Sequence, residues 1–220
     1  MRQFLKFAYD EPLEYRRSSN LRKKEPYLSD YVRDARGYVP WNNTQRGLPF
    51  PNVRSFPYPS ALHWSFGEND PSSLLLRKKK KTLMLFMGHF TKGAHVREII
   101  KRQCRSYKND SVCTVVNEKV KSGLEIKASA TFCLEPAGDT PSRKSISDSL
   151  AFGCIPVLFA NSTASLYRGF WDPRARFLID YDDFAEGKVD LASTLGAVSS
   201  SDVEELQAAV ERTKKRFTYR

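Results

Sequence analysis

Apolar and polar positions alternate in blocks along most of the chain, and the blocks predict strands and helices in turn. Short, nearly all-apolar runs are typical of strands that are covered on both faces. Longer runs with apolar residues three or four positions apart are typical of amphipathic helices. The predicted strands are 82–87, 112–116, 131–134, 154–159 and 177–181. The predicted helices are 94–107, 118–129, 142–152 and 201–217, the last with Ser201 as N-cap and Glu204 completing a capping box.

Strands that alternate with helices in this way are the pattern of a parallel sheet with crossover helices. The sequence therefore predicts an α/β fold, with one Rossmann-like domain over residues 71–220. Residues 1–70 are different, because they are polar and charge-mixed, and prolines interrupt any long periodicity. We expect an irregular segment there.

The loop 135–141 follows a predicted strand and precedes a predicted helix, which is where an open α/β sheet binds its ligands. A helix that starts after a loop of small residues presents unpaired N–H groups, and these favour an anion. Gly138 would let the backbone approach a phosphate, Thr140 and Ser142 offer hydroxyls, and Arg143 offers a charged fork. A diphosphate fits this set of groups.

The same residues also have a purely structural interpretation, in which the Asp139 side chain forms a hydrogen bond with its own backbone and Ser142 caps the helix. Both interpretations stay open on spacing alone. Further along the helix, Asp148 could accept a sugar hydroxyl, as acidic residues accept the ribose in dinucleotide-binding folds.

A second loop, 88–93, follows the first predicted strand. If that strand neighbours 131–134, both loops line one crevice, and Arg97 on the first turn of the next helix could reach the same anion. The alternative for Arg97 is an ordinary surface arginine, and His89 is either structural or catalytic. The sequence contains no P-loop, no GxGxxG and no HExxH motif.

The charge balance supports an anionic ligand. The chain has 36 Lys and Arg against 25 Asp and Glu, a net charge of +11. The basic clusters are not interleaved with the aromatic and glycine pattern of an RNA-binding sheet, and no helix-turn-helix or zinc-finger spacing occurs. A small anionic ligand is therefore favoured over nucleic acid.

The four cysteines have neither CxxC nor Cys/His spacing, so no metal site is expected. Cys104 and Cys113 flank a polar turn and would form a disulfide in an oxidising compartment. Cys133 and Cys154 lie in apolar runs, and we interpret them as small buried hydrophobic residues rather than as a disulfide.

Three Asn-x-Ser/Thr sequons, at Asn42, Asn109 and Asn161, are candidates for N-glycosylation. No stretch reaches the roughly 18 apolar residues of a membrane span. The first residues are too charged for a signal peptide. The chain is therefore expected either to be cytosolic or to have its anchor upstream.

The segment FCLEPAGDTPSRKSISDSLAFGCIPVLF resembles the signature of exostosin-family glycosyltransferases. In that family a Phe-Cys-Leu strand, a Pro-x-Gly-Asp turn, a Ser-Arg pair, an acidic residue and a Gly-Cys-Ile-Pro-Val strand follow in this order. FLIDYDDFAEG downstream and VRSFPYPSALHW upstream are also similar to family segments. The resemblance covers residues 80–217.

The resemblance implies a GT-B fold of two Rossmann-like domains, of which this chain holds the C-terminal, donor-binding half. It implies transfer of a sugar from a nucleoside diphosphate sugar, in the first instance a UDP-sugar, to a glycan acceptor. The transfer would invert the anomeric carbon and need no metal or other cofactor. Arg143, with Arg97 and the start of the helix, would stabilise the leaving diphosphate.

The chain also departs from the family. A complete GT-B enzyme needs roughly twice this length, so residues 1–70 would be a remnant of the acceptor domain and linker. The catalytic base has no candidate. The resemblance places the protein in the Golgi lumen, as a single-pass membrane protein if an anchor precedes it. The alternatives are an inactive member that binds nucleotide or glycan as partner of a related glycosyltransferase, and a basic glycan- or nucleic-acid-binding module.

Overall fold

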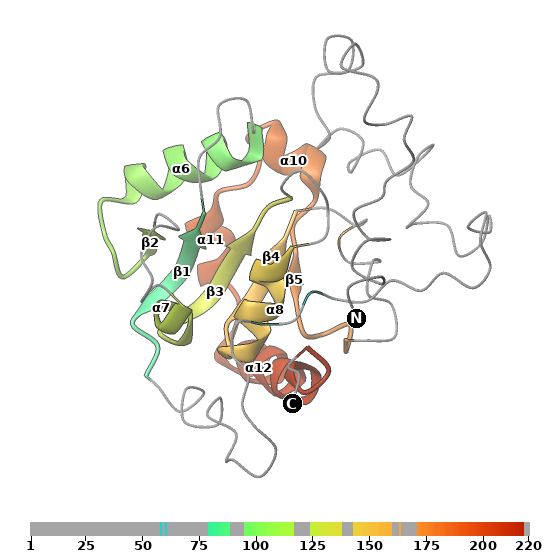
Figure 1. The fold of residues 1–220 in the computed structure, drawn as a ribbon. Helices are drawn as coiled ribbons and strands as arrows, with labels where there is room; N and C mark the ends of the chain where they lie inside the picture. Colours follow the sequence, from blue (N-terminus) through green and yellow to red (C-terminus); the bar gives the residue numbers. More distant parts are fainter. Residues whose placement is uncertain are drawn as a thin grey trace, which may run out of the picture.

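The computed structural model describes residues 79–88, 95–116, 124–137, 143–159 and 171–217, together with Tyr58, Ser60 and Thr163. Within these residues a five-stranded sheet has the order β2-β1-β3-β4-β5, and every neighbouring pair is parallel (Figure 1). The parallel α/β domain is therefore confirmed. The predicted boundary near residue 70 lies outside the described residues. The strands are β1 (Thr82–Met87), β2 (Cys113–Val116), β3 (Ala130–Glu135), β4 (Ile155–Leu158) and β5 (Phe177–Leu178).

The helices cover both faces of the sheet. The chain crosses from β1 to β2 in one direction and from β2 back over β1 to β3 in the other. Because such crossovers are right-handed, the connecting helices lie on opposite faces, and Figure 1 shows α7 and α8 in front of the sheet with α11 behind it. The helices are α6 (His95–Tyr107), α7 (Leu124–Ala128), α8 (Lys144–Ala151), α10 (Tyr181–Ala185), α11 (Leu191–Gly196) and α12 (Ser200–Lys214).

The central strands β1 and β3 are apolar on both faces, as their uninterrupted apolar runs predict. Successive side chains of a strand point to opposite faces, so Phe86 and Phe132 lie in the main hydrophobic core while Leu85 and Cys133 lie in a smaller one. Each of these four side chains is at most 1% exposed. The middle of the sheet is therefore a rigid support for the loops at its edge.

Some predicted boundaries are wrong. Strand β5 ends at Leu178, and Tyr181, predicted as its last residue, begins α10, where Asp180 accepts hydrogen bonds from the backbone of Asp182 and Asp183. Helices α10 and α11 were not predicted. At the start of α12 the N-cap is Ser199, whose hydroxyl accepts from Asp202 N. Ser201, the predicted cap, lies inside the helix, so the capping box with Glu204 does not form.

Two disulfides link neighbouring elements. Cys104 in α6 is joined to Cys113 in β2, with a Cα–Cα distance of 5.3 Å, which is the disulfide expected for an oxidising compartment. Cys133 and Cys154 are also joined, with a Cα–Cα distance of 5.8 Å, so their interpretation as unpaired buried residues is wrong. The reason is strand register. Cys133 pairs with Pro156 across β3 and β4, which brings Cys154 within bonding reach.

Candidate functional site

The site lies at the carboxyl edge of the sheet between β1 and β3. These strands are neighbours, with Leu85 paired to Cys133 and Phe86 paired to Leu134. In this strand order the chain winds away from β1 in both directions, and ligands bind in the crevice where that direction changes. The loops after β1 and β3 therefore start at one crevice, as the sequence predicts for neighbouring strands.

Part of the predicted site lies outside the described residues. This holds for His89 in the first loop and for four residues of the second loop, namely Gly138, Asp139, Thr140 and Ser142. Their assignment to a phosphate stays a prediction. The described candidates are Arg97, Arg143 and Asp148.

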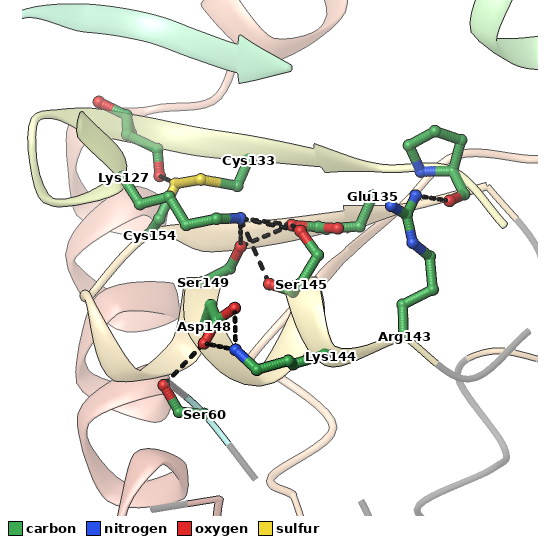
Figure 2. A network of polar contacts seen from close by, with 12 residues as sticks. Ser60, Lys127, Cys133, Glu135, Arg143, Lys144, Ser145, Asp148, Ser149 and Cys154 are labelled. Carbon is green, nitrogen blue, oxygen red and sulfur yellow. Dashed lines mark hydrogen bonds and ion pairs between the residues drawn. A yellow bond between two sulfur atoms is a disulfide. The ribbon is translucent and has the colours of Figure 1, made fainter. Parts of the chain in front are cut away.

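Two arginines meet at the last described residues of the loop after β3. Arg143 Nη1 donates to the carbonyl of Pro136 at 2.7 Å, and Arg97 Nη2 donates to the carbonyl of Ala137 at 3.3 Å. Arg97 is 8% exposed, so it is not the surface arginine of the alternative interpretation. Figure 2 shows Arg143 reaching back from the start of α8 to the end of β3. The structure thus gathers two positive charges at one end of β3.

Helix α8 begins at Lys144, and its N-cap is Arg143 rather than Ser142. Arg143 has an extended backbone, and its side chain makes no capping hydrogen bond. The first turn of α8 contains no acidic residue. The orphan N–H groups and the positive end of the helix dipole are therefore not neutralised by a side chain at the N-cap or by a carboxylate of the first turn.

Asp148 is held by protein groups. Its carboxylate accepts from Ser60 Oγ at 2.9 Å and from Lys144 Nζ at 3.0 Å, and only 5% of the residue is exposed. The neighbouring Ser147 donates to the carbonyl of Tyr58. Tyr58 and Ser60 of the FPYPSALHW segment are therefore hydrogen-bonded to α8 (Figure 2 shows Ser60). The predicted contact between Asp148 and a sugar hydroxyl stays a prediction.

The hydrogen bonds of Asp148 with Ser60 and Lys144 lead to a prediction about stability. We expect Asp148→Ala to lower the free energy of unfolding by about 1–3 kcal/mol, because it removes a buried charged acceptor from two donors. Denaturant unfolding measures the loss. Asp183→Ala removes the carboxylate of an exposed ion pair with Lys188 and should stay close to wild type. A large loss of UDP affinity at unchanged stability would instead assign Asp148 to the ligand.

A network that the sequence did not predict centres on Glu135, which directly precedes the two residues whose carbonyls accept from the arginines. Glu135, the last residue of β3, accepts from Lys127 Nζ at 2.8 Å, and both side chains are 2% exposed. Ser145 and Ser149 of α8 donate to the same carboxylate oxygen (Figure 2). Burial alone would raise the pKa of Glu135, but the charges of Lys127 and Arg143, together with the hydrogen bonds from Lys127 and Ser149, outweigh burial and keep this pKa below its ordinary value. One signal was available, since Glu135 is a charged residue at the end of an apolar strand.

Of the three sequons, Asn42 and Asn161 lie outside the described residues. Asn109 is exposed in the turn between α6 and β2, and its side-chain oxygen accepts from the backbone and hydroxyl of Ser111. Glycosylation there stays a prediction. In the described part of the chain, none of the helices combines the length and the apolar composition that crossing a bilayer requires.

The fold is a doubly wound α/β domain whose strand order changes direction between β1 and β3, the position at which such sheets bind their ligands. The family model described as the Exostosin GT47 domain matches residues 40–184, which is most of the chain. The chain therefore belongs to the exostosin GT47 family, and the resemblance found in the sequence is confirmed.

Among similar proteins, the xyloglucan-specific galacturonosyltransferase 1 of Arabidopsis thaliana is 38% identical over 105 residues, covering 44% of this chain and 15% of that protein. The probable xyloglucan galactosyltransferase GT19 of Arabidopsis thaliana is 25% identical over 212 residues, covering 83% of this chain and 44% of that protein. The chain thus spans less than half the length of these relatives.

Among solved structures, the pneumococcal O-GlcNAc transferase GtfA in complex with UDP and GlcNAc is similar with a TM-score of 0.44 and 11% identity. The similarity covers 74% of this chain and 35% of that one.

Proposed function

We propose that this chain is the donor-binding half of a GT-B glycosyltransferase, which transfers a sugar from a UDP-sugar to a glycan acceptor. Membership of the exostosin GT47 family supports the proposal, as do relatives that are named glycosyltransferases. One structural observation carries it. Arg97 and Arg143 converge where β3 ends and α8 begins, beside the crevice of the sheet.

In this proposal the two arginines and the start of α8 bind the diphosphate. Guanidinium groups donate two parallel hydrogen bonds to phosphate oxygens, and the N–H groups of a helix start add further donors. Negative charge grows on the diphosphate as the bond to the sugar breaks, so donors already in place stabilise the transition state more than the ground state. The positive charge of Arg143 and Arg97 would take the place of a metal ion.

The remaining parts of the reaction are also proposals. The transfer inverts the anomeric carbon, and a base deprotonates the acceptor hydroxyl. No described residue is assigned to that role. The names of the relatives make UDP-galactose and UDP-galacturonic acid the first donors to examine, with xyloglucan as the first acceptor.

We place the protein in the lumen of the Golgi. The support is that all four cysteines form disulfides, which persist in the oxidising compartments of the secretory pathway and are rare in the cytosol. A lumenal position would also expose Asn109 to glycosylation.

Binding and transfer test the proposal separately. Isothermal titration of the full chain with UDP should show binding, and incubation with radiolabelled UDP-galactose and xyloglucan should give a labelled polysaccharide. UDP binding without transfer by the chain or by its full-length protein would favour the non-catalytic partner. A full-length protein that binds no uridine nucleotide would exclude both.

A further inference from the structure

The two oxygens of the Glu135 carboxylate have unequal surroundings. Oε1 accepts three hydrogen bonds, from Lys127 Nζ at 2.8 Å, Ser145 Oγ at 2.9 Å and Ser149 Oγ at 2.6 Å. Oε2 is buried, and within the described residues it has no hydrogen-bond partner. Figure 2 shows the fan of contacts on one side of the carboxylate only. One carboxylate oxygen is thus fully bonded, while the other has no donor among the residues that the structure describes.

A buried carboxylate oxygen without a donor is costly, and native proteins keep few of them. Glu135 is also ionised at neutral pH, because Lys127 and Arg143 keep its pKa below the ordinary value. Oε2 can therefore accept a hydrogen bond but cannot donate one. The missing partner must carry an O–H or N–H group.

The position of Glu135 indicates where that partner comes from. It is the last residue of β3, and the next two residues, Pro136 and Ala137, receive Arg143 and Arg97. A phosphate cannot be the partner, because its negative charge would face another negative charge across a short distance. A hydroxyl group can donate to Oε2 and carries no negative charge. It would come close to Glu135 if the phosphates of the same molecule bound Arg97 and Arg143.

A second glutamate shows that a lysine on Oε1 and no donor on Oε2 do not by themselves indicate a ligand. In α12, Glu211 also pairs with a buried lysine, Lys214, through Oε1, and its Oε2 has no hydrogen-bond partner among the described residues. That side chain is 45% exposed, however, so a small movement brings it to water, and it lies outside the loops at the carboxyl edge. Glu135, whose side chain is only 2% exposed, lacks this solution.

We propose that Glu135 determines donor specificity, with Oε2 accepting a hydrogen bond from a hydroxyl of the bound sugar nucleotide, either on its ribose or on its hexose. This inference rests on the proposed function, since it needs a nucleotide on Arg97 and Arg143. Lys127, Ser145 and Ser149 are positioning residues, because they hold the carboxylate through Oε1 and leave Oε2 for the ligand.

The test removes the hydroxyl from the ligand and the carboxylate from the protein in turn. The full chain is titrated with UDP, 2′-deoxy-UDP, 3′-deoxy-UDP and UDP-galactose, as wild type and as Glu135→Gln. The glutamine carbonyl can keep the three Oε1 contacts, which turns its NH₂ toward the Oε2 position and replaces an acceptor by a donor. Lys127→Gln/Glu135→Gln repeats the test without an unpaired buried lysine, and Glu211→Gln is the matched control.

We expect wild type to prefer one hydroxylated ligand about tenfold, either UDP over a deoxy analogue or UDP-galactose over UDP. Glu135→Gln and the double variant should reduce that preference to within twofold, while Glu211→Gln keeps it. The pair of ligands whose affinity ratio changes shows whether Glu135 contacts a hydroxyl of the ribose or of the hexose. A purely structural role would lower thermal stability and weaken all ligands equally.

Two results overturn the inference while the proposed function stands. One is a preference that Glu135→Gln leaves intact, and the other is a wild type that binds nucleotide without either preference. Failure of wild type to bind any of the four ligands would overturn the proposed function, and this inference would fail with it.

Discussion

Arg143→Ala is expected to weaken UDP binding on the order of 100-fold, the cost of removing one well-placed charged donor from an anion site. Arg143 is the N-cap of α8, and its guanidinium lies 2.7 Å from the carbonyl of Pro136. Because this side chain makes no capping hydrogen bond, its loss should act on the diphosphate rather than on the helix start. Arg143→Lys should recover only part of the affinity, because an ammonium group lacks the planar fork of the guanidinium. Isothermal titration calorimetry measures both losses.

Arg212→Ala is the matched control for this prediction. Arg212 lies on α12, is half exposed and pairs with Asp172 at 2.8 Å, so its loss removes an ion pair away from the carboxyl edge. Its UDP affinity should equal that of wild type. Equal affinities for the two alanine variants would remove Arg143 from the site.

Removal of the Cys133–Cys154 disulfide is expected to cost about 3 kcal/mol of folding stability, as the loop-closure entropy of its 21-residue separation predicts. The double variant Cys133→Ala/Cys154→Ala should melt about 6–12 °C below wild type. UDP affinity should fall as well, because the closed loop contains the end of β3, the turn that follows it and α8. Thermal unfolding and UDP titration of the same sample give both numbers.

The other disulfide separates the two effects. Cys104→Ala/Cys113→Ala opens a 9-residue separation between α6 and β2, and it should cost about 2.5 kcal/mol. Its UDP affinity, measured well below its melting temperature, should match wild type. If both double variants lost UDP affinity equally, the disulfide beneath the site would have no special part in binding.

Strand β1 shows what the sequence determines well. Its bounds, Thr82–Met87, match the predicted run, because a buried parallel strand needs an unbroken apolar stretch that polar residues end on both sides. Helix α6 was predicted within one residue for the same kind of reason, since one apolar stripe packs against the sheet. The sequence left open whether β1 neighbours β3, and the structure shows that the two strands are paired.

The error at Cys133 and Cys154 arose where a partner distant in sequence decides the outcome. The residues next to Cys154 in the sequence do not reveal that Cys133 lies beside it on the adjacent strand. The contact of Asp148 with Ser60, 88 residues away, is equally invisible in the local sequence, and the proposed sugar contact of Asp148 stays a prediction. At the end of β5, the run Phe177–Tyr181 looks like one strand, yet Asp180 caps a new helix there, because its side chain competes for the backbone. Glu135 was missed because its one signal, a charge at the end of an apolar strand, does not reveal its partners Lys127, Ser145 and Ser149.

The connectivity of the disulfides bears on how the protein acquires them. Four cysteines can pair in three ways, and the native pairing joins each cysteine to the next one along the chain, Cys104 to Cys113 and Cys133 to Cys154. Each bond therefore closes one local stretch of the chain, and the two closed stretches do not overlap. The first pair can oxidise before the second pair has been synthesised, so the order of emergence from the ribosome already favours the correct connectivity.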